Sequence, residues 1–245
     1  MKVIKFILLF VFFLSSISCD NNNSMAYTSE DIEVFKSDFE YTGSIENNDV
    51  VIKKYIGNAS KIIIPNFVTT IGRNSFYGCE TVESIDLPYS IAYIESFAFE
   101  ECDNLENIYY RGTIKTWCNM KIYSNPMTFA EHFYMLNGKN VFTEVTSIEI
   151  PTTIKTLGHG QFKGLNIDRI LIPVSVEEIG CLAFETEIIY YQGTLEQWNE
   201  IIIHGSYVMS EGTLTYIDIL TNVKHLYVKN SNNENIDVID KVKIN

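Results

Sequence analysis

The sequence has few basic residues and few histidines. Its 245 residues contain 18 Lys and Arg against 31 Asp and Glu, a formal net charge of −13, and only four His. An acidic surface is repelled by nucleic acid and by anionic lipid, so we expect neither as a direct partner. The His and Cys residues lack the spacing of a zinc site, and no DxDxDG loop suggests calcium. No metal or other cofactor is therefore expected.

Sequence motifs of catalysis are also missing. The chain contains no GxSxG, HExxH, GxGxxG or P-loop pattern. A pair of glycosidase-like carboxylates could lie among the acidic residues of 83–103, but a solvated acidic face explains these residues as well. His159 lies between two glycines and reads as an exposed turn residue. The sequence therefore predicts a protein that is not an enzyme.

A long apolar run stands at the start of the chain. Two lysines precede the run at residues 6–14, and small residues then lead to Cys19. This pattern predicts a signal peptide over residues 1–18, too short for an ordinary spanning helix. A Cys in this position resembles the lipobox of bacterial lipoproteins, which implies cleavage before Cys19 and acylation of its thiol. An ordinary signal peptide or an uncleaved anchor is the alternative, and residues 19–37 otherwise read as a polar tether.

The chain repeats itself with a period of 22 or 23 residues. The stretch IIIPNFVTTIGRNSFYGC at 62–79 matches IDLPYSIAYIESFAFEEC at 85–102, with a weaker echo from residue 108. A second series begins with IEIPTTIKTLGHGQFKGL at 148–165 and continues with ILIPVSVEEIGCLAF at 170–184. These repeats predict a solenoid of six coils in two arrays, at residues 62–123 and 148–220.

The spacing of apolar residues describes one coil. IxIP predicts a short strand whose first and third side chains point inward and which Pro ends, and we expect Gly72, Gly158 and Gly180 to permit the next bend. Stacked coils would form parallel sheets with ladders of identical side chains. The predicted ladder of buried aromatic side chains consists of Phe76, Phe99, Phe162 and Phe184. Cys79 and Cys102 share another column, and because stacked parallel Cβ vectors suit a disulfide poorly, we expect structural thiols.

Segments outside the repeats predict the ends of the arrays. Residues 38–61 carry two strand-like runs around ENND, which indicates a hairpin cap over the first coil. Residues 221–245 have the same form around NSNNEN and predict a second cap or tail. Between the arrays, residues 124–147 break the period, and Asn137-Gly138 indicates a tight turn there.

These motifs resemble the BspA-like leucine-rich repeat family of bacterial surface proteins, whose repeat reads roughly LxxIxIPxxVxxIGxxAFxxC. The likeness covers about residues 38–203, including YYRGTIKTWCNMKIYSNPMTFAEHFYMLNGKNV at 109–141. It implies a mostly β leucine-rich-repeat solenoid with short helical turns. It also implies export across the inner membrane, a lipid anchor, display at the outer membrane and cell surface, and adhesion-type binding of a host or matrix protein.

Two tyrosines are the candidate binding residues. Adjacent side chains of a strand point to opposite faces, so in YY at 109–110 and 190–191 the columns direct Tyr109 and Tyr190 outward. Tyrosine suits interfaces, and ordinary sheet-surface residues are the alternative. The outward columns are Ile63, Asp86 and Tyr109 in the first array and Glu149, Leu171 and Tyr190 in the second. Alternative functions are glycan binding in polysaccharide capture, with tyrosines stacked on sugar rings, and a structural role in the envelope.

Overall fold

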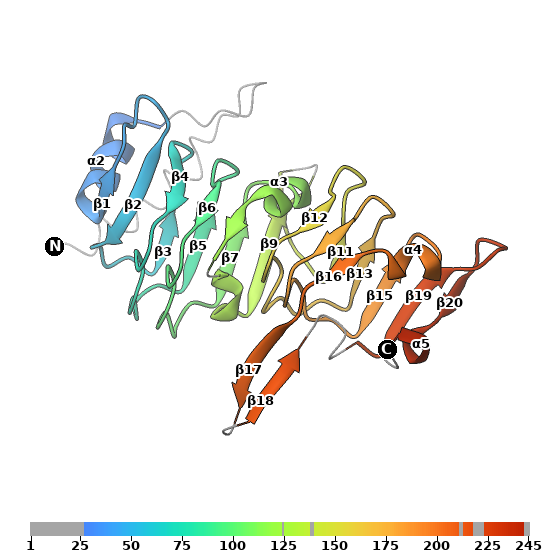
Figure 1. Cartoon of the computed structure of the whole chain (residues 1–245). Helices are drawn as coiled ribbons and strands as arrows, with labels where there is room; N and C mark the ends of the chain where they lie inside the picture. Colours follow the sequence, from blue (N-terminus) through green and yellow to red (C-terminus); the bar gives the residue numbers. More distant parts are fainter. Residues whose placement is uncertain (1–26, 124, 138–139, 211–212, 218–222, 243–245) are drawn as a thin grey trace. The chain divides into compact units, whose positions relative to one another are not determined.

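The computed structural model describes residues 27–123, 125–137, 140–210, 213–217 and 223–242 (Figure 1). The chain divides into two units, residues 1–37 and 38–245. The described part of the second unit consists mainly of short strands. Its elements are β1 (Phe39–Thr42), β2 (Val50–Tyr55), β3 (Lys61–Ile63), β4 (Val68–Ile71), β5 (Ser84–Leu87), β6 (Tyr93–Ile94), β7 (Asn107–Tyr110), α3 (Ile114–Asn119), β8 (Lys121–Ile122), η1 (Pro126–Thr128), β9 (His132–Leu136), β10 (Phe142–Glu144), β11 (Ser147–Glu149), β12 (Thr156–Leu157), β13 (Arg169–Ile172), β14 (Glu178–Ile179), β15 (Ile188–Tyr191), α4 (Leu195–Asn199), β16 (Ile202–Ile203), β17 (Ser206–Ser210), β18 (Thr213–Ile217), β19 (His225–Lys229), β20 (Asn235–Asp237) and α5 (Ile239–Val242).

The segment predicted as a tether contains a helix. Helix α2 spans Ser29–Asp38, and its first turn is closed by reciprocal bonds between Thr28 and Asp31. The amide of Asp31 donates to Thr28 Oγ1 over 3.2 Å, and the amide of Thr28 donates to Asp31 Oδ2 over 2.7 Å. This is a capping box, which satisfies two amide donors that a helix start leaves unpaired. Residues 29–37 are therefore not an extended tether, and the TSED pattern at 28–31 was the signal for the helix.

Parallel strands stack into a solenoid, which confirms the predicted fold. One face of the coils carries two sheets with matching orders, β3-β5-β7-β9-β10 and β11-β13-β15-β19-β20. In each, the first four strands are parallel and the last is antiparallel. The other face carries β1-β2-β4-β6-β8 and β12-β14-β16, and Figure 1 shows the succession of short strands along the second unit. The antiparallel hairpin β17–β18 pairs only with itself among the described strands.

Two segments outside the predicted arrays join the sheets. Strand β9 lies in the segment predicted to break the period, yet it pairs in parallel with β7 and so extends the first array. Strand β19 lies in the predicted C-terminal cap and pairs in parallel with β15 in the same way. Each then turns back into its antiparallel partner, β10 or β20. The period breaks in sequence because a short helix and a longer connection precede these strands, while the ladder itself continues.

The variant coils carry helices with a common start. Thr113 and Thr194 are the N-caps of α3 and α4, and each accepts a hydrogen bond from the backbone three residues later. The helices bury Trp117 and Trp198, which contact Tyr110 and Tyr191 edge-on at ring distances of 5.0 and 5.3 Å. The repeated GTxxxW pattern thus places the same buried aromatic pair in the variant coil of each array.

The core contains the expected aromatic residues. Phe76, Phe99, Phe162 and Phe184 are buried. The rings of Phe76 and Phe99 stack with centroids 5.2 Å apart, and Phe162 forms a parallel bridge with Phe184. Cys79 and Cys102 carry free thiols, and the buried thiol of Cys102 donates to the carbonyl of Phe76 over 3.0 Å. Burial raises the pKa of Cys102 to about 12, which keeps this thiol protonated and unreactive.

The glycines of the repeat lie at turns, because the carbonyls of Gly72, Gly158 and Gly180 each accept a hydrogen bond from the amide three residues later. Gly72, Gly158 and Gly180 have no positive φ, so none supplies a left-handed bend. A Cβ on Gly72 would lie 2.3 Å from the carbonyl oxygen of Ile52 on the preceding coil. That carbonyl accepts the Gly72 amide over 2.9 Å. Gly72 therefore begins a turn as predicted, and the close approach of two coils is the reason that glycine is needed there.

Candidate functional site

Each candidate tyrosine belongs to a stacked pair on the outward side of its sheet. The register places Tyr134 of β9 beside Tyr109 of β7, and Tyr227 of β19 beside Tyr190 of β15. The rings of Tyr109 and Tyr134 lie 4.9 Å apart at 15°, and those of Tyr190 and Tyr227 lie 4.8 Å apart at 14°. We call these pairs the first and second tyrosine ladders. The same geometry arises twice because parallel strands hold equivalent side chains one strand spacing apart.

A histidine paired with a carboxylate flanks each ladder. His132 lies two residues before Tyr134, and its Nδ1 is 2.6 Å from Glu144 Oε1 on β10. His225 lies two residues before Tyr227, and its Nδ1 is 2.6 Å from Asp237 Oδ2 on β20. The hydrogen bond with Glu144 raises the pKa of His132. Burial tends to raise the pKa of Asp237, but the bonds from His225 and two backbone amides hold it below its ordinary value.

Stacking covers one face of each ladder tyrosine ring. All four ladder tyrosines are half-buried. Tyr109 is covered by Tyr134 on one side and contacted edge-on by Phe142 at 5.0 Å and 68°. None of the four hydroxyls has a hydrogen-bond partner among the described residues. The ladders therefore offer paired phenol hydroxyls beside a carboxylate and an imidazole, a set suited to polar recognition by a macromolecule.

The acidic residue expected in the first outward column is neutralised. Asp86 lies next to Tyr109 in register, but its Oδ1 accepts a hydrogen bond from Arg111 Nε over 2.8 Å. Both side chains are largely covered, with 19% and 8% of their surface exposed. Burial raises the pKa of Asp86 to about 6, against the opposing effect of the Arg111 charge. Asp86 is therefore part of a buried ion pair and not of an open acidic stripe, a correction to the sequence interpretation.

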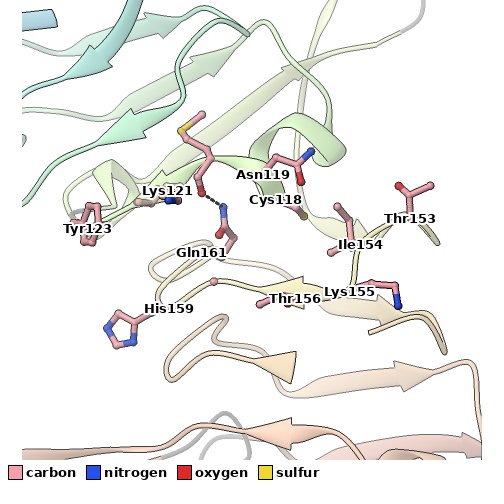
Figure 2. Close-up of a pocket in the computed structure, with 13 residues that line it drawn as sticks. Cys118, Asn119, Lys121, Tyr123, Thr153, Ile154, Lys155, Thr156, His159 and Gln161 are labelled. Atoms are coloured by element: carbon pink, nitrogen blue, oxygen red, sulfur yellow. Dashed lines mark hydrogen bonds between the residues drawn. The ribbon is translucent and has the colours of Figure 1, made fainter. Parts of the chain in front are cut away.

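A pocket of about 610 Å³ lies at the junction of the two arrays. Its walls are residues 118–123, at the end of the first array, and 153–161, at the start of the second. Figure 2 shows Lys121 and Tyr123 on one side, Lys155 and Thr156 on the other, and Gln161 between them. Apolar side chains of Ile122 and Ile154 join these polar ones, so the pocket combines an aliphatic lining with ammonium groups.

Side chains hold the arrays together beside the pocket. Trp117 Nε1 donates to the carbonyl of Gln161 over 2.8 Å, and Asn125 Nδ2 donates to the carbonyl of Gly160 over 2.9 Å. In return, Gln161 Nε2 donates to the carbonyls of Trp117 and Met120. Within each array the backbone ladder makes such links directly. At the junction, amide and indole groups replace the ladder.

Sequence reasoning missed several of these residues. Tyr134 and Tyr227 lie outside the repeat columns, but HFY at 132–134 and HLY at 225–227 form a recurrent HxY signal. His159 was interpreted as a plain turn residue, yet its Nδ1 lies within hydrogen-bond distance of Cys181 Sγ. The signal-peptide and lipid-attachment predictions, including Cys19, fall outside the described residues.

No group of three or more His, Cys, Asp or Glu side chains in the described part of the chain could hold a metal ion. No described helix has the length and apolar character needed to cross a bilayer.

Comparison with known proteins gives a family and several structural neighbours. The family described as the BspA type leucine rich repeat region matches in six copies over residues 48–129 and 138–244. A leucine rich cell surface protein of Faecalibacterium prausnitzii is 19% identical with a TM-score of 0.40, over 86% of this chain and 60% of that one. A leucine-rich repeat protein of T. pallidum is 16% identical with a TM-score of 0.32, over 63% of this chain and 83% of that one. One from Bacteroides ovatus is 22% identical with a TM-score of 0.28, over 62% and 33%. No curated protein matches.

Proposed function

Because the chain belongs to the BspA-type leucine-rich-repeat family, we propose that it binds a protein partner at the bacterial cell surface. The proposed function is binding without catalysis, and the tyrosine ladders are the proposed contact surfaces. The observation that carries this proposal is the duplication: two separate sheets present a stacked tyrosine pair beside a histidine–carboxylate pair.

The ladder geometry favours a protein partner over a glycan. Stacking on a sugar requires a free aromatic face, and one of the two faces of each ladder tyrosine is already covered by its neighbour. The exposed hydroxyls and carboxylates instead suit a polar protein surface, for which tyrosine is a frequent anchor. A rigid sheet also lowers the entropic cost of binding, since its side chains are already ordered. Host and matrix proteins fit this description, and glycan capture and a structural envelope role remain the alternatives for the test.

The proposed location rests on the start of the sequence. The chain would be exported across the inner membrane, cut before Cys19, and held at the outer membrane by lipid on that thiol. Changing Cys19 to Ala should move the protein from the detergent phase to the aqueous phase, because its acidic surface offers no electrostatic attachment to anionic lipid. Membrane association that survives the change would refute the anchor, while leaving the binding proposal open.

The binding test uses an array of matrix proteins and purified glycans, probed with the intact chain. We expect binding to matrix proteins that weakens with salt, because charged groups flank both ladders. On the protein that binds, paired changes of Tyr109 and Tyr190 to Ala should lower affinity by at least about 1 kcal/mol. The matched change of both residues to Phe keeps the stacking and removes only the hydroxyls.

The two sets of variants separate recognition from scaffolding. Loss of affinity in both sets, with the Phe variants as stable as the parent chain, supports recognition through the hydroxyls. Affinity that holds in both sets would show that the ladders are scaffold. Salt-insensitive binding confined to glycans would favour the alternative function.

A further inference from the structure

Two unpaired strand edges border the junction pocket. Strand β8 ends the sheet β1-β2-β4-β6-β8, and β12 begins the sheet β12-β14-β16 on the same face of the solenoid. Neither has a second neighbour among the described strands. The pocket is lined by both residues of β8 and by Thr156 of β12 (Figure 2). The two sheets are therefore interrupted at this one position in the described part of the stack.

The backbone at these edges points into the pocket. The amides of Lys121 and Tyr123 donate to the carbonyls of Ala92 and Ile94 over 2.9 and 2.8 Å, so the N–H and C=O of Ile122 between them point the other way. At β12, the carbonyls of Lys155 and Leu157 accept from the amides of Glu178 and Gly180 over 3.2 and 2.8 Å. By the same alternation, the N–H and C=O of Thr156 face the pocket. Each edge thus presents a free donor and acceptor.

The arrays touch at one corner and separate at these edges. A Cβ on Gly164 would lie 2.3 Å from the carbonyl oxygen of Met127, so the backbones of the two arrays are in close contact there. Near β8 and β12 the link runs through the long side chain of Gln161. A strand rises about 3.3 Å per residue, with about 4.8 Å between strands and about 10 Å between sheets, or roughly 160 Å³ per residue. A pocket of about 610 Å³ therefore has room for about four residues.

We infer that the pocket binds an extended peptide segment of a protein partner, which inserts as a strand between β8 and β12 and makes their two sheets continuous. Backbone hydrogen bonds to Ile122 and Thr156 would supply affinity, as in other cases of strand addition to a sheet edge. This site is separate from the tyrosine ladders and does not depend on them.

The neighbouring columns define the side chains of the inserted strand. The inward column contains Ile94 and Ile122 on one side and Leu157 and Ile179 on the other, so an aliphatic residue belongs between them. In the outward column, Lys121 lies opposite the residue of the inserted strand that precedes this aliphatic residue. Lys121 has no carboxylate within ion-pair distance among the described side chains. Because opposite charges on neighbouring strands attract, an acidic residue belongs there. The partner segment therefore contains an acidic residue followed by an aliphatic one.

The chain itself provides a suitable probe. Strand β14 already pairs with the other edge of β12, with Glu178 opposite Thr156 and Ile179 opposite Leu157. A labelled synthetic peptide with the sequence SVEEIG, residues 175–180, should bind the intact chain saturably. Replacing both Glu by Lys in the peptide, or methylating its backbone nitrogens, should weaken binding at least tenfold. In amide hydrogen exchange, the peptide should protect Ile122 and Thr156.

Variants of the two edges complete the test. Thr156→Pro removes the edge donor at an exposed position where an edge strand tolerates proline, and it should weaken binding at least tenfold. Thr156→Val keeps the donor and should bind as the parent chain does. Lys121→Glu should prefer the SVKKIG peptide, whereas Lys115→Glu, on α3 and outside the pocket, should not.

Three results would overturn the inference. They are failure of the SVEEIG peptide to bind, equal binding of the N-methylated peptide, and unchanged binding by the Thr156→Pro variant. The exchange measurement uses the unaltered chain, so it decides the question even if a variant does not fold.

Discussion

Truncation of two phenylalanines of one coil should destabilise the protein to very different extents. Phe99 is fully buried and stacks on Phe76 at 5.2 Å and 12°. Phe97, two residues earlier, is 46% exposed, has a positive φ of 61°, and lies 5.1 Å from the guanidinium of Arg73. The two residues are the same type and lie two positions apart in FAF at 97–99, so their different responses test which of them the register of the solenoid buries.

The expected magnitudes follow from burial. Phe99→Ala removes a core ring and leaves a cavity, which costs about 3–5 kcal/mol. The lost stacking on Phe76 places the expected value in the upper part of that range. Phe97→Ala loses only a surface cation–π contact, which is worth about 0.5–1 kcal/mol. Since 1 kcal/mol shifts the melting temperature of a chain this size by about 2–4 °C, Phe99→Ala should lower it by roughly 10 °C.

Urea denaturation followed by circular dichroism measures both variants against the parent chain. The difference in unfolding free energy between them should be at least about 2 kcal/mol, because only one change opens a cavity. Equal losses at the two positions would refute the stacked-coil core as described. A larger loss at Phe97 would show that Phe97, and not Phe99, occupies the buried ladder column.

Three further predictions concern single groups. The pKa of His132, measured by NMR titration, should lie above its ordinary value of 6.5 and fall in Glu144→Gln, because the carboxylate stabilises the imidazolium. The ion pair is then present below that pKa and is lost as pH rises through it. Ser75→Ala should raise the unfolding free energy by about 1 kcal/mol, since the buried Ser75 hydroxyl has no hydrogen-bond partner among the described residues. Gly72→Ala should lower it, because a Cβ would clash with a carbonyl of the preceding coil; an unchanged urea midpoint would contradict either stability prediction.

Much of the fold follows from the sequence because a solenoid is locally determined. Each coil contacts its neighbours in the stack, so a period of 22 or 23 residues fixes which side chains share a column. The parallel register of Ile62, Ile85 and Ile108 is the one that the repeat implies. This reasoning did not predict strands β9 and β19. A helix and a longer connection precede each of them, so the number of residues from the preceding parallel strand no longer matches the repeat period.

The candidate sites were less predictable because they depend on contacts between dissimilar segments. Tyr109 and Tyr190 could be placed outward from alternation alone. Their stacking partners come from strands that lack the IxIP repeat, and the Asp86–Arg111 ion pair joins two coils through side chains of different length. The junction pocket arises where the ladder stops, and a break in a repeat does not specify how far the backbones separate.

The two tyrosine ladders differ in what surrounds them, and this difference bears on how a partner would use them. Beside the first ladder, Arg111 holds Asp86 in a covered ion pair and also donates to the carbonyl of Ile64. At the matching place beside the second ladder stands Leu171, which is half-buried and uncharged. A partner that binds both ladders would need two similar epitopes, and linkage would then raise its affinity without new contacts. A partner that binds one ladder can distinguish them by this neighbouring column, since a buried ion pair resists displacement while an aliphatic side chain favours an apolar contact.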